Sequence, residues 1–130
     1  MTDKELIALA FEACEKAYAP YSGCKVGAAL LGKSGKVYTG CNIENSSFGA
    51  TNCAVRTAVF KAVSEGEKEF VKIATAGIKE GESAVFYPCG ICRQVLAEFC
   101  TEDFPVISAK SEDEYETNTL GDLLKNSFRL

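Results

Sequence analysis

The sequence PCGIC at residues 88–92 decides how the rest of the chain is interpreted. It is a CxxC motif, and a proline at this place is typical of a helix start. Two thiolates at that spacing can face one side, and the positive end of a helix lowers their pKa values. Cys89 and Cys92 are therefore predicted to hold a tetrahedral metal ion.

A third cysteine, Cys53, begins another predicted helix over residues 53–64, with Thr51 and Asn52 as capping residues. If the two helices lie side by side, the three sulfurs converge. Three ligands leave a fourth position open for water, as in a catalytic zinc site. Two other interpretations stay open on these residues alone: a thioredoxin-like redox pair, and Cys53 as core filler.

Two arginines lie close to the predicted ligands in the sequence. Three thiolates on Zn²⁺ carry a net charge of −1, which weakens the pull of the metal on a bound water. Arg56 and Arg93 could hydrogen-bond the sulfurs and restore that pull. The alternative for both is a surface salt bridge.

The composition limits which residues can form a metal site or a catalytic group. The 130 residues include seven cysteines and no histidine. A transition-metal site must then be built from thiolates and carboxylates, and Ser-His and Cys-His catalysis is excluded. An odd number of cysteines cannot pair completely within one chain, which argues against a disulfide framework.

Charge and patterning exclude several classes of partner. The net charge is −4 and the basic residues are scattered, so no nucleic-acid-binding surface is expected. The first residues lack the basic and apolar regions of a secretory signal, and no stretch reaches membrane-spanning length. We expect a cytoplasmic protein without a membrane partner.

Periodicity predicts an alternating order of elements. A first helix is capped by Thr2, with capping-box spacing to Glu5, and ends near Tyr18 because Pro20 follows. Strands are expected at residues 25–31, 36–41, 70–76 and 105–109, and further helices at 53–64, at 89–99 and from Thr119. This order predicts a single α/β domain over residues 1–130, a three-layer α/β/α sandwich with a mixed sheet.

The motifs resemble those of a known enzyme family. The segments CAVRTA at 53–58, PCGICRQ at 88–94 and GCNIEN at 40–45 resemble the small, homotetrameric cytidine deaminases, and the resemblance covers nearly the whole chain. It implies hydrolytic deamination of cytidine or deoxycytidine in pyrimidine salvage, a cytidine deaminase-like fold and a homotetramer.

The resemblance also implies roles for individual residues. It gives Zn²⁺ to Cys53, Cys89 and Cys92. It gives the ribose to Asn42 and Glu44, which a strand would present on one side because they are two residues apart. It places the backbone of Ala54 against the base, and it places Phe128 near the pocket, often that of a neighbouring subunit.

Three positions depart from the family pattern, and one of them is Phe48, which stands where the family commonly has tyrosine. Val55 stands where the family has the glutamate that shuttles protons, a function typically worth about 10²–10⁴-fold in rate. Cys24 stands where the family has an aromatic residue that stacks on the pyrimidine. We therefore expect impaired or redirected turnover. The alternatives are a non-catalytic zinc-containing nucleoside-binding protein and a hydrolase acting on a modified pyrimidine nucleoside.

Overall fold

One mixed sheet organises the computed structural model, which describes residues 1–130. Its strands are β1 (Cys24–Gly32), β2 (Val37–Cys41), β3 (Phe70–Lys79), β4 (Glu82–Ala84), β5 (Pro105–Ala109) and β6 (Tyr115–Thr119). The order across the sheet is β2-β1-β3-β5-β6, and β4 pairs with the end of β3. Only β3 and β5 run parallel.

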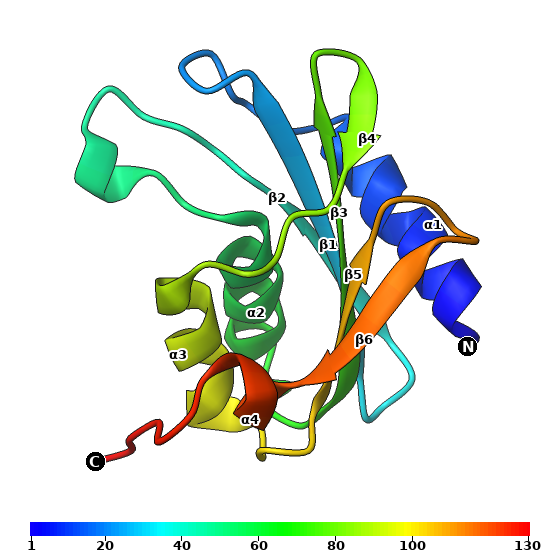
Figure 1. The fold of residues 1–130 in the computed structure, drawn as a ribbon. Coiled ribbons are helices and arrows are strands. Elements are labelled where there is room, and N and C mark those ends of the chain that lie inside the picture. Colours follow the sequence, from blue (N-terminus) through cyan, green and yellow to red (C-terminus); the bar gives the residue numbers. More distant parts are fainter.

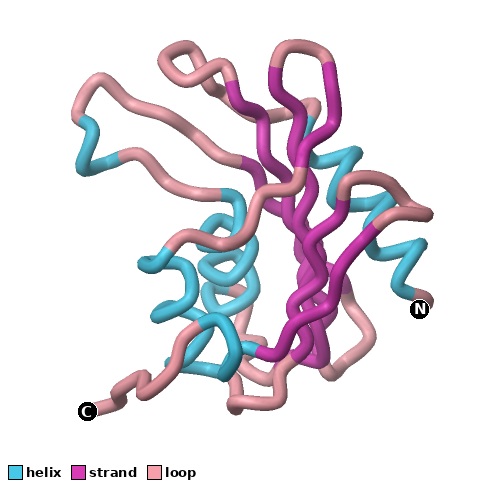
Figure 2. The backbone as a smooth tube through the Cα atoms, viewed as in Figure 1, coloured by secondary structure: helices cyan, strands magenta, loops and turns pink.

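Helices cover both faces of this sheet. They are α1 (Asp3–Cys14), α2 (Ala54–Ser64), α3 (Gly90–Phe99) and α4 (Leu120–Leu123), with a short 3₁₀ turn η1 (Phe48–Ala50). α1 lies on one face, and α2 and α3 lie on the other (Figures 1 and 2). The predicted three-layer α/β/α arrangement with a mixed sheet is confirmed. None of the helices has the length and apolar character needed to span a bilayer.

Each face of the sheet buries its own apolar core. On the α1 side, Leu6 and Ile7 are fully buried and pack against β-strand residues such as Ile107. On the other side, Val59 of α2 and Leu96 of α3 are fully buried in a larger cluster. Burial of each such side chain is worth about 1.5–3 kcal/mol, so both helix layers are held to the sheet mainly by apolar contact.

The first helix is shorter than its sequence pattern predicts. It ends at Cys14 rather than near Tyr18, although Thr2 caps its start as expected by accepting from the backbone of Glu5. Tyr18 instead pairs with the chain that follows β2: its N–H donates to Asn42 O, and its carbonyl accepts from Glu44 N. Backbone pairing at this edge therefore takes Tyr18 out of the helix.

Strands β3 and β5 separate at Gly77, and the functional site lies where they separate. Ala76 is the last β3 residue paired with β5, whereas Gly77 is paired with Ala84 of β4. The chain then crosses from β4 to the start of α3. The separation lies at the carboxyl end of the parallel strands, where α/β sheets commonly bind ligands.

Candidate functional site

Three sulfur atoms converge where two helices begin. Cys53 is the N-cap residue of α2, Cys89 is the N-cap residue of α3, and Cys92 lies in the first turn of α3. Their Sγ atoms all lie within 4.8 Å of one another, and Cys89 Sγ is 3.7 Å from Cys53 and 3.4 Å from Cys92. The convergence predicted from the sequence is confirmed.

The surroundings of the cluster favour a thiolate at Cys53. Hydrogen bonds from the Cys92 thiol and from Arg56 lower the pKa of Cys53 to about 5, although burial opposes this shift. The pKa of Cys92 is raised, because its thiol donates to Cys53 and because it is buried. A preformed set of three close sulfurs, one of them with a lowered pKa, fits Zn²⁺.

The two arginines near the cluster have different roles. Arg56 donates from Nη2 to Cys53 Sγ at 3.1 Å, as expected. Arg93 does not contact a sulfur: its Nε donates to Pro88 O at 2.6 Å, and its Nη1 donates to Leu123 O at 2.7 Å. The expectation for Arg93 is corrected, because two carbonyl oxygens hold its guanidinium. It ties the segment before Cys89 to α4 instead.

The cluster forms the floor of a cavity of about 250 Å³. The cavity is mainly apolar and is lined from the sheet, from α2 and from the segment before α3 by Val26, Asn42, Glu44, Thr51, Asn52, Cys53, Ala54, Val55, Thr75, Phe86, Tyr87, Pro88, Cys89 and Cys92. A larger hollow of about 410 Å³ lies beside the C-terminal arm. It contains none of the three clustered sulfurs, so the smaller cavity is the candidate active site.

The family of the chain follows from comparison with known proteins. A model of the cytidine and deoxycytidylate deaminase zinc-binding region matches residues 1–108. The chain belongs to this deaminase family. It is 48% identical over 128 residues to the cytidine deaminase of Sporosarcina psychrophila, covering 98% of this chain and 92% of that protein. It is 46% identical to the cytidine deaminase of Halalkalibacterium halodurans, covering 98% and 95%.

Solved structures give the same assignment. The cytidine deaminase of Burkholderia pseudomallei has a TM-score of 0.89 at 45% identity, covering 98% of this chain and all of that one. The cytidine deaminase of Mycobacterium tuberculosis has a TM-score of 0.84 at 37% identity, with both chains fully covered. This deaminase chain therefore shares its fold with them.

Two polar side chains, Asn42 and Glu44, also line the deaminase cavity. Asn42 accepts from Val26 N at 2.9 Å and donates to Cys24 O at 2.8 Å. Glu44 accepts from Tyr21 N, Ser22 N and Ser22 Oγ, and these hydrogen bonds lower its pKa, with that of the Ser22 hydroxyl contributing most. Both residues line the cavity, and each retains hydrogen-bonding capacity for a ligand.

The remaining candidate residues divide into two groups. Ala54 and Val55 line the cavity, and Val55 is buried with only 3% of its surface exposed. Cys24 and Phe128 do not line it. The Cys24 thiol contacts Ser22 O at 3.8 Å, and Phe128 is 64% exposed on the C-terminal arm. Within one chain, neither side chain is placed to touch a ligand in this cavity.

Sequence reasoning missed several residues of the cavity wall, among them Thr75 and Phe86. Thr75 is buried in β3 and donates from Oγ1 to Phe86 O at 2.9 Å. Phe86 follows β4, a strand that was not predicted. The predicted strand ended at residue 76, one residue before Gly77, whereas β3 continues to Lys79. A glycine within a strand often marks the close approach of another group, and the shorter prediction hid this signal.

Proposed function

We propose that this deaminase chain binds cytidine or deoxycytidine with its base toward Cys53, Cys89 and Cys92 and its sugar toward Asn42 and Glu44. The lining offers a partner for each part of the nucleoside: sulfurs and apolar side chains for the base, and the amide of Asn42 and the carboxylate of Glu44 for the sugar. A site built to hydrogen-bond hydroxyl groups discriminates strongly against ligands that lack them.

The sugar-binding role rests on the hydrogen bonds that Asn42 and Glu44 have left. Asn42 uses one of its two N–H groups, and Glu44 accepts three hydrogen bonds of about four that a carboxylate can accept. Neighbouring hydroxyls of a sugar can use the rest. The contacts with β1 and with residues 21–22 fix both side chains before a ligand arrives, which reduces the entropy lost on binding.

Cys53, Cys89 and Cys92 are the residues that would hold Zn²⁺, with Arg56 donating to Cys53. When bound, zinc polarises a ligand and lowers the pKa of a water. The chain itself must then supply the proton transfers to the ring and to the leaving amine. Glu44 is the only carboxylate that lines the cavity, and its hydrogen bonds with Tyr21 and Ser22 hold it at the proposed sugar-binding position.

Because no other carboxylate lines the cavity, we propose that turnover is slow. The side chain beside the cluster is Val55, which can neither accept nor donate a proton. General acid–base help is typically worth about 10²–10⁴-fold in rate. We therefore infer a deaminase that binds its nucleoside well and converts it poorly.

The test is the loss of cytosine absorbance when zinc-loaded protein is incubated with cytidine, for the wild type and Val55→Glu. We expect Val55→Glu to be about 10²–10⁴-fold faster in kcat. Val55→Gln, which has a similar shape and no titratable group, should stay at the wild-type rate. If Val55→Glu binds zinc and nucleoside but is no faster than wild type, the proposal of a missing proton carrier is wrong.

The same observation favours a second candidate, a non-catalytic nucleoside-binding protein. Calorimetry with uridine, combined with the assay of cytidine conversion, separates the two. Binding of uridine with no conversion of cytidine above the buffer rate supports this candidate. Measurable zinc-dependent conversion supports the slow enzyme.

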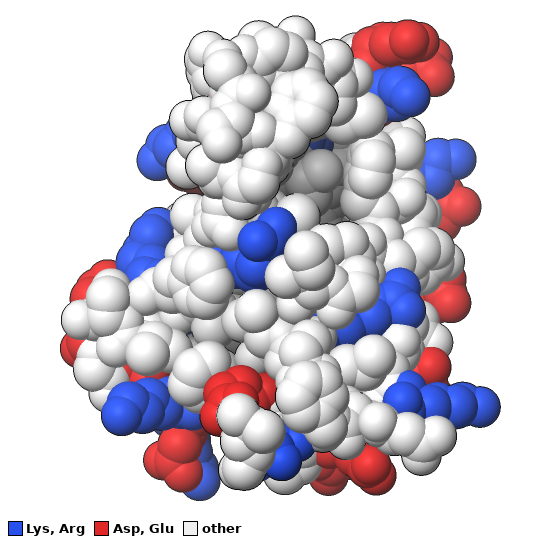
Figure 3. All heavy atoms as spheres, turned by 90° about the vertical axis from the view of Figure 1, so that its left-hand side faces the viewer, with Lys and Arg blue, Asp and Glu red and all other residues white.

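We also propose that residues 1–130 form one domain that assembles as a homotetramer. Both apolar cores share the single sheet. On the side that carries η1 and α3, charged side chains lie mainly along the edges and in the lower part, and the surface is hollowed above its centre (Figure 3). Phe48, Ile91 and Phe128 are exposed, and exposed apolar side chains that gather in one patch mark interfaces. In such an assembly Phe128 could serve a neighbouring chain, and light scattering measures the subunit number.

A further inference from the structure

One aromatic ring is fixed in the wall of the active-site cavity by two independent contacts. Phe86 is half-buried and lines the cavity, and its carbonyl accepts from Thr75 Oγ1 at 2.9 Å. Its ring occupies the space above Gly77: a Cβ added to this glycine would lie 1.9 Å from Phe86 Cδ2 and 2.3 Å from Cε2. The hydrogen bond from Thr75 therefore fixes the backbone of Phe86, and the Phe86 ring packs against the sheet at Gly77.

The position of the ring over Gly77 is next to apolar residues of the cavity wall. Gly77 is the cross-strand partner of Val26, another lining residue. Thr75, two residues before Gly77 on the same face of β3, lines the cavity as well. Ala54 and Val55 line it from the start of α2. A planar base between the sheet and α2 would therefore meet the Phe86 ring.

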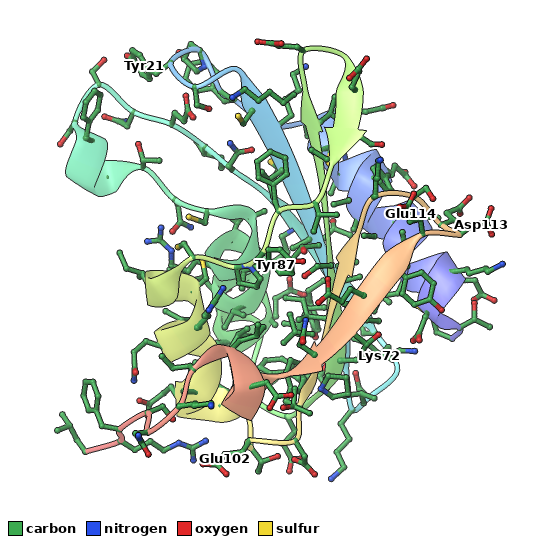
Figure 4. The ribbon with its side chains drawn as sticks, in the orientation of Figure 1. Tyr21, Lys72, Tyr87, Glu102, Asp113 and Glu114 are labelled. Atoms are coloured by element: carbon green, nitrogen blue, oxygen red, sulfur yellow. The ribbon has the colours of Figure 1, made fainter.

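No other side chain of this cavity can take that place. Tyr87 is the second aromatic residue of the lining, but its hydroxyl donates to Glu116 of β6 at 2.6 Å. Figure 4 shows Tyr87 on the segment that crosses from β4 toward α3. Cys24 of β1 is directed to Ser22 O and does not line the cavity.

We propose that Phe86 stacks on the base and selects planar, unsaturated pyrimidines. The inference rests on the proposed function, because it names the side chain that orients the base of that nucleoside. Favourable aromatic pairs are offset-stacked or edge-to-face, and a saturated ring loses the π-system that makes them favourable. Phe86 is thus a specificity-determining residue.

The test compares the affinities of uridine and 5,6-dihydrouridine for the zinc-loaded protein by calorimetry. The two ligands carry the same sugar, so their ratio isolates the contact with the base. We expect wild type to prefer uridine by about 3- to 10-fold. Phe86→Leu should lose this preference, and Phe86→Tyr should retain it. Phe11→Leu, on the opposite side of the sheet, is the matched control and should match wild type.

Gly77→Ala gives a second test that leaves the ring in the sequence. A methyl group at this position displaces the ring from its place against the sheet, so the preference for uridine should also fall. If Phe86→Leu and Gly77→Ala bind zinc and keep the wild-type preference, the role of Phe86 is overturned while the proposed function stands. If wild type binds neither nucleoside, the proposed function is overturned, and this inference with it.

Discussion

The guanidinium of Arg56 lies 3.1 Å from the sulfur of Cys53, one turn away on α2, and donates a hydrogen bond to it. Three thiolates and Zn²⁺ together carry a charge of −1, and the arginine balances it. The same contact helps to lower the pKa of Cys53, after the larger effect of Cys92. The affinity of the site for zinc should therefore depend on Arg56, although Arg56 is not a zinc ligand.

Arg56→Met should therefore weaken zinc binding about 10- to 100-fold, the usual effect of losing a partner of a metal ligand. Methionine keeps much of the apolar stem and removes the charge and the donors. Competition with a chromophoric chelator at neutral pH measures the affinity. Lys33→Met, at the exposed turn between β1 and β2, is the control for charge. Equal zinc affinities for Arg56→Met and Lys33→Met would contradict the role of Arg56.

Removal of a single cluster sulfur should abolish stable zinc binding. Cys92 is buried within the cluster, whereas Cys100 at the end of α3 is buried outside it, and burial raises the pKa of Cys100 to about 12. Metal analysis of purified protein should therefore find zinc in Cys100→Ala and little in Cys92→Ala. Equal zinc contents would show that the cluster is not the metal site.

The thiol cluster could be predicted because local rules and its chemistry agree. Cys53 and Cys89 each precede a helix, and N-cap positions of neighbouring helices can face one another. Arg93 could not be placed from the sequence, because the carbonyl oxygens of Pro88 and Leu123 that hold it are brought together by tertiary structure. The spacing of an arginine from a ligand does not reveal which acceptor its long side chain reaches.

The short strand β4 and the end of helix α1 were the least predictable parts of the fold. β4 has three residues, Glu82–Ala84, and only its pairing with β3 makes it a strand. Phe86 lies in the loop after β4, and without that hairpin nothing in the sequence places it beside Gly77 of β3. The sequence pattern predicts that the first helix continues past Cys14. Backbone hydrogen bonds between Tyr18 and the chain after β2 outweigh this local helical preference.

Stability should depend on pH through Glu67, which holds the turn between β1 and β2. Its carboxylate accepts from Ser34 N, Ser34 Oγ and Tyr38 Oη, and these hydrogen bonds, above all that of the Ser34 hydroxyl, lower its pKa below 4.5. The unfolded state then binds the proton more readily than the folded state. The stabilisation is complete above the ordinary pKa and is lost as the pH falls through the lowered one.

The urea midpoint of wild type should accordingly fall more steeply than that of Glu67→Gln as the pH is lowered from about 6 to 3. At neutral pH, Glu67→Gln should be the less stable protein. Glu69→Gln serves as the control, because this exposed carboxylate has only a 3.9 Å ion pair with Lys33. Parallel curves for wild type and Glu67→Gln would contradict the assignment.

The close approach of β2 to α2 should control both stability and the metal site. A Cβ at Gly40 would lie 2.5 Å from Ala54 O and 2.5 Å from Ala58 N, and both are backbone atoms of α2. Gly40→Ala must therefore push α2 away from the sheet. Overpacking of this kind typically costs about 1–3 kcal/mol in the free energy of unfolding.

Because Cys53 is the N-cap residue of α2, the displacement should move its sulfur relative to Cys89 and Cys92, which belong to α3. Gly40→Ala should then lose zinc affinity as well as stability, measured by chelator competition and urea unfolding. Gly49→Ala, where an added Cβ meets nothing within 4 Å, should change neither. Lost stability with unchanged zinc affinity in Gly40→Ala would mean that the α2 N-terminus adjusts independently of its helix. The packing of β2 on α2 would then not set the geometry of the cluster.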